Sequence, residues 1–456
     1  MKSFPSYWLK VFLSFSLLVV SLLLPASVTA QTDPFQARRT KLIEKTDKGL
    51  IILKNGKSPD GSNTSVQNKN FFYLTGLYTP EGYLVIEGKS GKSTIYREVS
   101  RYRQPDPLPA GLEGKSMEDF DKDLAKLVMT NRNLWVEFDQ LTIFGKPGIR
   151  IAAETIKNPS QVINGMRPVK DETEIGLIKK SAEINALGLV EMMKAAEPGM
   201  NEKDLELILD YSFKKLGSTG YSFGIQAASG PNSTSIHYYA NDRTTETGDM
   251  MVFDVGAEYQ NYTADISRTI PVSGKFTKEQ KEIYSIVLNA QKAGIAKMLP
   301  GKGMEEADVA VTNELNKGLF ALGLITDTLQ NWQRTIWMQH GWDHSIGLVV
   351  HDVAGPYVRG QKEVLEPGMI YTMEPGLYFP ANYFDKSNYK IQMVPEVELK
   401  AFMEKVEPIF KKYINIGVRI EDDVLITPTG NEVITKAVPK EIVDIEATMK
   451  LKSRFN

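Results

Sequence analysis

Two aspartates stand on a predicted β-hairpin, close enough to share a cation. Asp254 lies in Met251-Val-Phe-Asp-Val-Gly and Asp265 in Tyr262-Thr-Ala-Asp-Ile-Ser-Arg, with a short polar turn around Gln260-Asn261 between them. In an antiparallel hairpin with this loop, both side chains face the same way as opposite or diagonal neighbours, roughly 5–8 Å apart at Cβ. Carboxylates so close repel each other, so the pair favours a bound cation, although by itself it fits a solvated acidic hairpin equally well.

The histidines are few and concentrated. The chain has 4 histidines, and three of them fall in the stretch from His340 through His344 to His351. The spacing of His340 and His344 resembles a helical metal-binding pair, but the glycines around them predict a turn or an extended segment. A His-Glu-x-x-His motif does not occur, which disfavours a zinc protease site carried on a helix. The fourth histidine, His237, precedes the acidic hairpin and favours a functional cluster over isolated structural histidines.

Two glutamates add to the acidic set. Glu374 ends the apolar run that starts at Met369 and is followed by Pro375-Gly376. Glu421 lies in a predicted strand in which it shares one face with Arg419. Either glutamate alone fits a salt bridge, because a carboxylate in an apolar strand is costly unless it is paired or metal-bound. Taken with the two aspartates and His344, they make an oxygen-rich set suited to two divalent cations.

The elements that position these residues are predicted from periodicity. Apolar residues at helical spacing predict helices over 171–196, 205–216, 279–298 and about 305–322, and an earlier one over 116–130. Strands are predicted at 51–53, 83–86, 250–259, 262–271, 369–373 and 416–426. Two rounds of helix followed by paired strands predict a pseudo-symmetric α+β domain. The polar and aromatic stretch 381–413 is predicted to be an irregular loop inserted between two strands, and a lid over the cleft is one hypothesis for it.

Length and composition fit a two-domain soluble protein. The chain has 456 residues, of which 42% are hydrophobic and 24% charged. A net charge of −2 provides no basic surface for nucleic acid, so none is expected as a partner. Zero cysteines exclude disulfides, thiolate metal sites and a cysteine nucleophile.

The first thirty residues are predicted to be a signal peptide. Lys2 and Lys10 precede an apolar run from Val11 to Leu24, and Ala26 to Ala30 supplies small residues for cleavage before Gln31. An uncleaved anchor is the alternative, although the run is short for a membrane span. The mature protein is therefore expected to be exported, in the periplasm or outside the cell, with no stable membrane span. The predicted organisation is residues 1–30 as signal, 31–165 as an N-terminal domain and 166–446 as the catalytic domain, with 381–413 inserted.

The order of these residues resembles a known family. It is similar to that of the pita-bread metallopeptidases, which include aminopeptidase P, prolidase, methionine aminopeptidase and the metal-free creatinase. The matching positions are His237, Asp254, Asp265, His340, His344, His351-Asp352, Glu374-Pro-Gly and Arg419-Ile-Glu421. Arg38-Arg39 and Phe71-Phe-Tyr-Leu-Thr-Gly-Leu77 are similar to the N-terminal domain of aminopeptidase P, which methionine aminopeptidase lacks. The expected fold is thus a pita-bread α+β catalytic domain with a smaller α/β domain before it.

The resemblance implies a role for each residue. Asp254 would chelate one metal ion, Asp265 and Glu421 would bridge two, and His344 and Glu374 would complete the shell of the second. Glu374 would also shuttle protons in the attack of water on the scissile carbonyl. His237, His340 and His351 would orient the substrate and stabilise the oxyanion. The implied cofactors are two divalent ions, with manganese the leading expectation and zinc, cobalt and iron as alternatives.

The resemblance also implies the reaction. The expected activity is release of the first residue from peptides whose second residue is proline, by a homo-oligomer, either dimer or tetramer. The rival is a prolidase, which cleaves only dipeptides. A creatinase-like enzyme is disfavoured because all five metal-ligand positions are kept, and for the same reason so is a non-catalytic peptide-binding relative.

Overall fold

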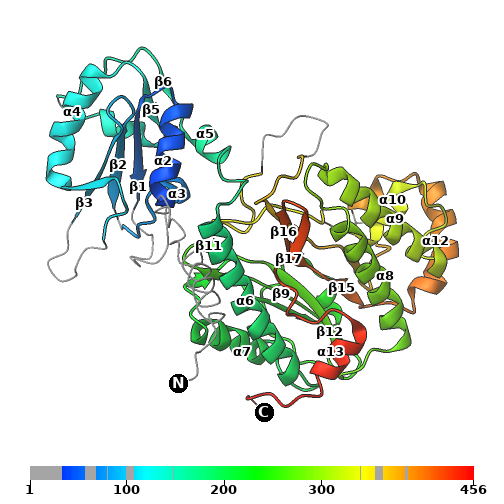
Figure 1. Cartoon of the computed structure of the whole chain (residues 1–456). Coiled ribbons are helices and arrows are strands. Elements are labelled where there is room, and N and C mark those ends of the chain that lie inside the picture. The colour runs from blue at the N-terminus through cyan, green and yellow to red at the C-terminus, as the bar shows by residue number, and fades with distance from the viewer. Residues whose placement is uncertain are drawn as a thin grey trace, which may run out of the picture.

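The computed structural model describes residues 33–56, 68–79, 81–98, 107–146, 148–338, 340–354, 363–385 and 389–455 (Figure 1). The predicted signal peptide lies outside the described residues. Among the described residues, no helix is long and apolar enough to cross a membrane. Figure 1 shows a smaller N-terminal part, coloured blue to cyan, beside a larger part that runs from green to red.

The N-terminal part is a mixed sheet with helices on both faces. Its strands lie in the order β4-β3-β2-β1-β5-β6, with β1 antiparallel to β2 and parallel to β5. They are β1 (Leu50–Asn55), β2 (Gly82–Glu87), β3 (Lys92–Arg97), β4 (Leu112–Ser116), β5 (Leu134–Val136) and β6 (Ile156–Lys157). The helices are α2 (Pro34–Lys45), α3 (Lys69–Thr75), α4 (Phe120–Thr130) and α5 (Ser160–Asn164), with 3₁₀ turns η1 (Met117–Asp119) and η2 (Phe138–Phe144).

The side chains of β1 alternate between the two faces of the sheet, which explains why helices cover both faces. Leu50 and Ile52 pack into a core with Phe120 of α4, whereas Ile51 and Leu53 pack into a core with residues of α2 and α3. Successive side chains of a strand point to opposite faces, so an apolar residue at every position requires a helix on each side. The strands predicted at 51–53 and 83–86 are confirmed, and the helix predicted over 116–130 begins at Phe120.

The larger part contains four long helices that pack in pairs. They are α6 (Glu172–Ala195), α7 (Glu202–Lys215), α8 (Lys278–Ile295) and α9 (Met304–Leu322), with α6 against α7 and α8 against α9. Three of them begin with a capping box, in which Asp171, Asn201 and Thr277 accept a backbone N–H of the first turn. Such caps satisfy donors that have no partner inside the helix, and they fix where each helix begins. All four helices are where the sequence predicted them.

The strands of this part form small antiparallel sheets. Three are three-stranded, β12-β9-β8, β13-β16-β17 and β11-β10-β7, and they are accompanied by the two-stranded sheet β14-β15. The strands are β7 (Gly220–Tyr221), β8 (Gln226–Ser229), β9 (Met250–Val255), β10 (Ala257–Tyr259), β11 (Tyr262–Thr263), β12 (Ile266–Pro271), β13 (Ile370–Met373), β14 (Gly376–Tyr378), β15 (Gly417–Arg419), β16 (Asp422–Thr427) and β17 (Gly430–Val433). Two rounds of paired helices followed by paired strands are therefore present. Asp265, Glu374 and Glu421 each fall in a short break between consecutive strands.

The prediction of an irregular loop over 381–413 is wrong. The segment joins β14 to β15 but contains α11 (Tyr389–Gln392) and the long helix α12 (Glu396–Phe410). Leu399, Phe402, Val406 and Phe410 form its buried face. This spacing is helical, and two prolines obscured it, one just before the helix and Pro408 in its last turn.

The α12 helix packs away from the candidate site rather than over it. Phe402 contacts Trp332, and Phe410 stacks on Trp337 of α10 (Asn331–Trp337). None of the described residues of 381–413 lines the pocket of the candidate site. The packing of this segment therefore gives no support to the lid hypothesis. A short helix, α13 (Ile442–Thr448), follows the last strand.

Candidate active site

The hairpin of β9 and β12 places the two aspartates on one face. Asp254 lies opposite Ser267, which makes Asp265 its diagonal neighbour. This is one of the two arrangements that the sequence predicted. Both aspartates are buried, with 9% and 5% of their surface exposed, so the alternative of a solvated hairpin is excluded.

The second pair of strands brings the glutamates to the same place. Met373 pairs with Asp422, so Glu374 and Glu421 occupy the next position of the same register. The segment before β13 runs alongside it: the Thr372 N–H donates to the His344 carbonyl at 2.9 Å, and the Glu374 N–H donates to the Trp342 carbonyl at 2.8 Å. His344 is therefore extended rather than helical, as its flanking glycines predicted.

Asp265, His344 and Glu421 form a cluster with the geometry of a metal site. Each offers one ligand atom, and these atoms lie within 4.8 Å of one another. The His344 Nε2 is 3.6 Å from Asp265 Oδ2, 3.9 Å from Glu421 Oε1 and 3.3 Å from Glu374 Oε1. In the described part of the chain, no other group of histidine, aspartate or glutamate side chains converges in this way.

The electrostatics of the cluster fit divalent cations. Asp265 Oδ1 and Glu421 Oε1 are buried and have no hydrogen-bond partner. Burial and the repulsion of neighbouring carboxylates raise the pKa of Asp265 and Glu374 well above their usual range, and burial with the charge of Asp254 raises the pKa of Glu421 to about 8. Oxygens that cost so much to ionise without a partner are suited to hard or borderline metal ions.

His344 is in the protonation state that a metal ligand needs. Burial, and to a lesser degree the neighbouring His351, lowers the pKa of His344 to about 4. The rings of the two histidines meet edge to face with centroids 4.3 Å apart. A neutral imidazole keeps a lone pair for coordination, so His344 is prepared to bind a cation at neutral pH.

Asp254 is oriented by three polar neighbours. Its Oδ2 accepts from Arg419 Nη2 at 2.6 Å and from Gln226 Nε2 at 2.7 Å, and its Oδ1 accepts from Ser267 Oγ at 3.0 Å. Arg419 and Glu421 face the same way, as the sequence predicted. Both contact the Ser267 hydroxyl, which accepts from Arg419 Nε and donates to Glu421 Oε2. Asp254 remains in the same pocket, next to the cluster of Asp265, His344 and Glu421.

His340 is held as one tautomer by a chain of hydrogen bonds. Arg419 Nη1 donates to the Tyr378 hydroxyl at 3.0 Å, and that hydroxyl lies 2.7 Å from His340 Nε2. His340 Nδ1 contacts the Gly341 carbonyl, which can only accept, so the proton is on Nδ1 and Nε2 accepts from Tyr378. His340 Nδ1 is also 3.7 Å from Glu374 Oε2. The ring therefore stands beside the cluster rather than inside it.

The cluster opens into a pocket of about 460 Å³ that contains all four histidines. His237 and His351 line it from exposed positions. Phe223, Ile236 and Tyr239 add an apolar wall to the polar floor. The structure thus brings together every site residue named from the sequence: His237, Asp254, Asp265, His340, His344, His351, Glu374, Arg419 and Glu421.

Comparison with known proteins agrees with this geometry. A family model for the N-terminal domain of aminopeptidase P matches residues 35–104, and a model for metallopeptidase family M24 matches residues 176–428, more than half of the chain. The chain belongs to metallopeptidase family M24. The Xaa-Pro aminopeptidases of Haemophilus influenzae and Escherichia coli K12 are both 31% identical to it, each alignment covering 91% of this chain and 97% of the relative.

Solved structures place this M24 chain in the expected fold. Aminopeptidase P from E. coli with the inhibitor Pro-Leu superposes with a TM-score of 0.78 at 30% identity, covering 91% of this chain and 97% of that one. The aminopeptidase PepP of Pseudomonas aeruginosa superposes with a TM-score of 0.76 at 28% identity over the same shares. The prediction of a pita-bread α+β domain preceded by a smaller α/β domain is confirmed.

Several residues of the M24 site were not identified from the sequence. Ser267, Tyr378 and Gln226 hold Asp254, Arg419 and His340 in place, as described above. Ser267 could have been found from the hairpin register, since it is the residue opposite Asp254. Tyr378 and Gln226 are single polar groups in short buried strands, and no spacing pattern singles them out.

Asp352, which the family resemblance singled out together with His351, lies behind the pocket and fixes the loop that carries His351. Its carboxylate contacts Arg167 and accepts from the backbone N–H of Val353 at 2.9 Å and of Leu348 at 3.3 Å. Its own N–H donates to the carbonyl of Ser345, the neighbour of His344, at 2.9 Å. A Cβ at Gly347 would lie 1.9 Å from Asp352 Oδ2, so only glycine fits beneath this carboxylate. The Arg167–Asp352 pair thereby positions two histidines of the site.

Proposed function

We propose that this chain is a metal-dependent Xaa-Pro aminopeptidase, which releases the first residue of peptides that have proline second. The observation that carries the proposal is the convergence of Asp265, His344, Glu374 and Glu421 in one pocket, in a chain whose N-terminal part matches the aminopeptidase P N-terminal domain. The relatives that match over nearly their whole length are named for this activity. The same set of metal-ligand side chains, in a member of metallopeptidase family M24, supports a hydrolase.

Two divalent cations are the proposed cofactors, and manganese is the proposed metal. Asp265 and Glu421 would bridge the ions, Asp254 would hold one, and His344 with Glu374 would hold the other. Four carboxylates and one neutral imidazole suit manganese, but they also suit zinc, cobalt and iron. A solved structure of the E. coli relative is a zinc-substituted form with product, which shows that the metal of that enzyme can be exchanged. Metal analysis of the purified protein tests this assignment.

The residues of this chain divide the chemistry between them. When bound, the cations supply Lewis acidity, which activates water at neutral pH and polarises the scissile carbonyl. Glu374, whose pKa is raised by burial, takes the proton of the attacking water and returns it to the prolyl nitrogen as that nitrogen leaves. His351 lies beside His344 at the pocket wall, where an imidazole N–H can donate to the developing oxyanion. We assign His340 to substrate orientation from its place in the pocket beside Glu374.

The defining experiment compares Xaa-Pro dipeptides with Xaa-Pro-Yaa tripeptides and longer peptides, with manganese and with chelator. Metal-dependent release of the first residue from the longer peptides establishes the aminopeptidase. Cleavage confined to dipeptides would make the chain a prolidase. Failure to cleave any of these peptides in the metal-loaded state would overturn the proposal.

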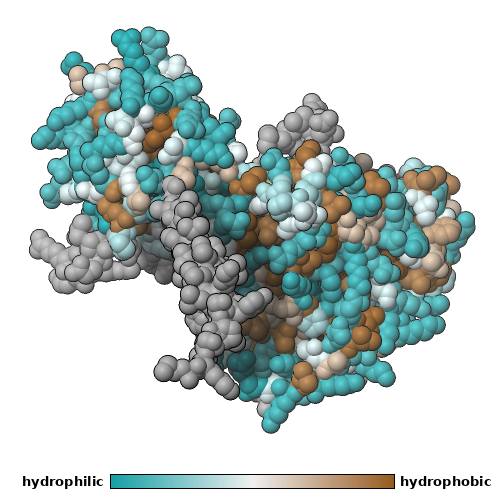
Figure 2. Space-filling view, in the orientation of Figure 1, coloured by the Kyte–Doolittle hydropathy of each residue, from teal (hydrophilic) through white to brown (hydrophobic). Residues whose placement is uncertain are grey.

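We further propose that the enzyme is exported and assembles as a dimer or tetramer. The two lysines, the apolar run and the small residues of 1–30 support export to the periplasm or the medium. Figure 2 shows a mostly hydrophilic visible face, with hydrophobic patches mainly on the larger part. Leu329, Met393 and Val397 are 86%, 71% and 84% exposed, and we take these apolar residues as candidates for the self-association surface. Light scattering and cell fractionation test the two statements separately.

A further inference from the structure

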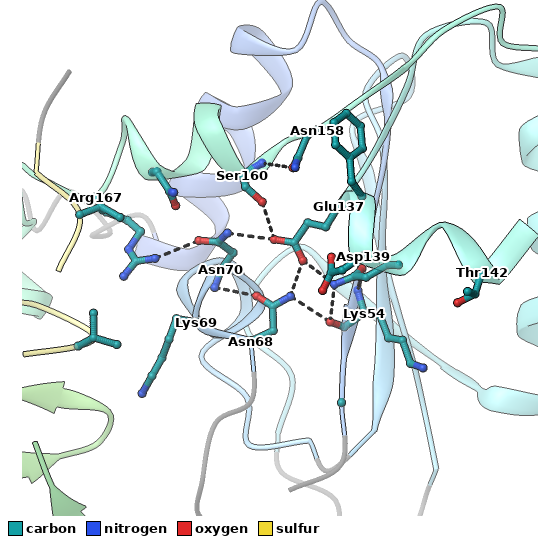
Figure 3. Close-up of a pocket in the computed structure, with 16 residues that line it drawn as sticks. Lys54, Asn68, Lys69, Asn70, Glu137, Asp139, Thr142, Asn158, Ser160 and Arg167 are labelled. Atoms are coloured by element: carbon teal, nitrogen blue, oxygen red, sulfur yellow. Dashed lines mark hydrogen bonds between the residues drawn. The ribbon is translucent and has the colours of Figure 1, made fainter. Parts of the chain in front are cut away.

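A buried carboxylate of the N-terminal part is surrounded by neutral donors. Glu137 follows β5 at the start of η2 and borders a cavity of about 840 Å³ between the N-terminal and catalytic parts. Its Oε2 accepts from Asn68 Nδ2 at 2.6 Å and Gln140 Nε2 at 2.5 Å, and its Oε1 accepts from Asn70 Nδ2 at 3.0 Å and Ser160 Oγ at 2.8 Å. Figure 3 shows Asn68, Asn70 and Ser160 turned toward this carboxylate. Four donors fill its lone-pair sites, so Glu137 orders its neighbours instead of binding a ligand.

Glu137 decides which way the amide of Asn70 points. A carboxylate only accepts hydrogen bonds, so Asn70 has to present its Nδ2 to Glu137. The Asn70 Oδ1 is thereby turned to the other side, where it accepts from Arg167 Nη1 at 3.1 Å (Figure 3). A neutral amide in place of Glu137 would not impose this orientation, because an amide donates as well as accepts.

Arg167 depends on this orientation. Its side chain is buried, its Nε has no hydrogen-bond partner, and the guanidinium has Asn70 and Asp352 as hydrogen-bond partners among the described residues. Asp352 in turn holds the backbone of residues 344–353, the histidine loop, through the three hydrogen bonds described above. If Asn70 no longer accepts, a buried N–H of Arg167 is left without an acceptor, which is costly. The guanidinium then has to move to find one, and Asp352 moves with it.

The histidine loop is also tied to the hairpin that carries Asp265. Thr263 of β11 donates to the Gly347 carbonyl from its N–H at 2.9 Å and from its Oγ1 at 3.0 Å. Thr263 lies two positions before Asp265, whose Oδ2 is 3.6 Å from His344 Nε2. A displacement of the histidine loop toward or away from Arg167 therefore changes the geometry of the candidate metal cluster and of the histidines beside it.

We propose that Glu137 is a positioning residue of the active site. Acting through Asn70 and Arg167, it sets the place of the histidine loop. Only the effect on turnover rests on the proposed aminopeptidase activity, since the effect on the loop requires no reaction. Glu137 does not line the catalytic pocket, so its replacement acts through geometry. It should lower kcat more than it changes KM, because the oxyanion near His351 exists only after the substrate has bound.

The first test variant is Glu137→Gln, in which one oxygen becomes an NH₂ group. This group has to lie on the side of Asn70. The amides on the other side, those of Asn68 and Gln140, are fixed because both also bond to the backbone of Lys54. The Asn70 amide then has to turn, and its own NH₂ faces the guanidinium, where an acceptor is needed.

Two further variants separate this route from a general loss of packing. Asn70→Asp alone sets two carboxylates against each other and should behave like Glu137→Gln. The double variant Glu137→Gln/Asn70→Asp exchanges acid and amide between the two positions. The new amide then donates to the new carboxylate and to Ser160 Oγ, and the new carboxylate accepts from Arg167. Every donor again has an acceptor, so the double variant should resemble the wild type.

Backbone amide exchange of residues 340–354, followed by mass spectrometry, reports on the histidine loop without any need for activity. Exchange should be about three- to tenfold faster in each single variant and return to the wild-type rate in the double variant. With an Ala-Pro tripeptide and saturating manganese, kcat should fall about 10- to 100-fold in each single variant and recover in the double variant, while KM changes less than about threefold. Glu44→Gln, at an exposed glutamate of α2, is the matched control and should leave both readouts unchanged.

Unchanged loop exchange or unchanged kcat in Glu137→Gln would overturn the inference. A double variant no better than the single variants would also overturn it, because a route through Asn70 requires rescue. If Glu137→Gln does not fold, the double variant decides: a folded protein with wild-type loop exchange supports the inference, and a second failure to fold overturns it. If the wild type cleaves no peptide, the aminopeptidase proposal fails, while amide exchange still tests the action of Glu137 on the loop.

Discussion

Glu202 is expected to control turnover although it lies outside the metal cluster. It is fully buried at the start of α7 and accepts five hydrogen bonds from the segment 229–243, which carries His237. Its Oε1 accepts from Ser229 N–H at 2.6 Å, Ser229 Oγ at 2.7 Å and Asn232 Nδ2 at 3.3 Å. Its Oε2 accepts from Tyr238 Oη at 2.8 Å and Arg243 N–H at 3.0 Å.

The need for such support follows from the backbone of the segment. His237 has a φ of 59°, in the left-handed region that costs a residue with a side chain about 1–2 kcal/mol. In Glu202→Gln one oxygen becomes an amide NH₂ that faces the Arg243 N–H, while the Tyr238 hydroxyl can turn and accept. One buried backbone donor is left without an acceptor, which costs ~1–3 kcal/mol. A segment that relieves this cost by leaving the catalytic conformation lowers the active population, so kcat/KM should fall by about 5- to 140-fold, since ~1.4 kcal/mol is a factor of ten.

The assay is steady-state cleavage of an Ala-Pro tripeptide, with bound metal measured on the same samples. Metal content should stay at the wild-type level, because none of the hydrogen bonds of Glu202 reaches a metal-ligand candidate. Tyr238→Phe removes one donor of five and should have a smaller effect. Glu183→Gln, which changes an exposed glutamate of α6 paired with Lys180, is the control and should behave as wild type. Wild-type kcat/KM in Glu202→Gln would refute the reasoning, and a parallel loss of metal would show that Glu202 acts on the cluster instead.

Three further outcomes are expected. Asp265→Asn should abolish activity and lower metal content with little loss of fold by circular dichroism; near-normal turnover with unchanged metal stoichiometry would contradict the assignment. Tyr378→Phe should lower kcat by about tenfold, the equivalent of one buried hydrogen bond, while bound metal stays constant; metal loss would instead place His340 in the coordination shell. In metal-free protein, stability should be highest near pH 4–5 and should fall as pH rises through 8, because the pKa of Glu421 is raised to about 8 and its ionisation is disfavoured in the folded state. Manganese should therefore raise the melting temperature more at pH 8 than at pH 6, and an equal increase at both would count against a carboxylate-rich site.

Much of the scaffold could be predicted because it follows local rules. The helices α6 to α9 have apolar residues at helical spacing, and three have capping boxes that can be read directly from the sequence. The placement of Asp254 and Asp265 on one face, as opposite or diagonal neighbours, followed from hairpin geometry alone. The α12 helix was missed because prolines at both ends outweighed the helical spacing of Leu399, Phe402, Val406 and Phe410.

The convergence of the site could not be derived from local rules. Asp265 and Glu421 lie 156 positions apart in the numbering, and nothing local specifies that β12 and β15 run side by side. The family resemblance supplied that information. Supporting residues such as Glu202 and Tyr378 could not be identified from the sequence. A single buried polar group in an apolar element has the same sequence pattern whether it supports a site or only the fold.

The N-terminal part is joined to the catalytic centre by one continuous set of polar contacts. Asn70 donates to Glu137 and accepts from Arg167 Nη1 at 3.1 Å, and Arg167 in turn contacts Asp352. Asp352 then hydrogen-bonds to the backbone of Ser345, Leu348 and Val353, which fixes the loop between His344 and His351. Because each of these groups is buried and breaking one leaves its partner unsatisfied, the position of the N-terminal part and the position of the two histidines are energetically coupled. The N-terminal part therefore contributes to the active site through its geometry.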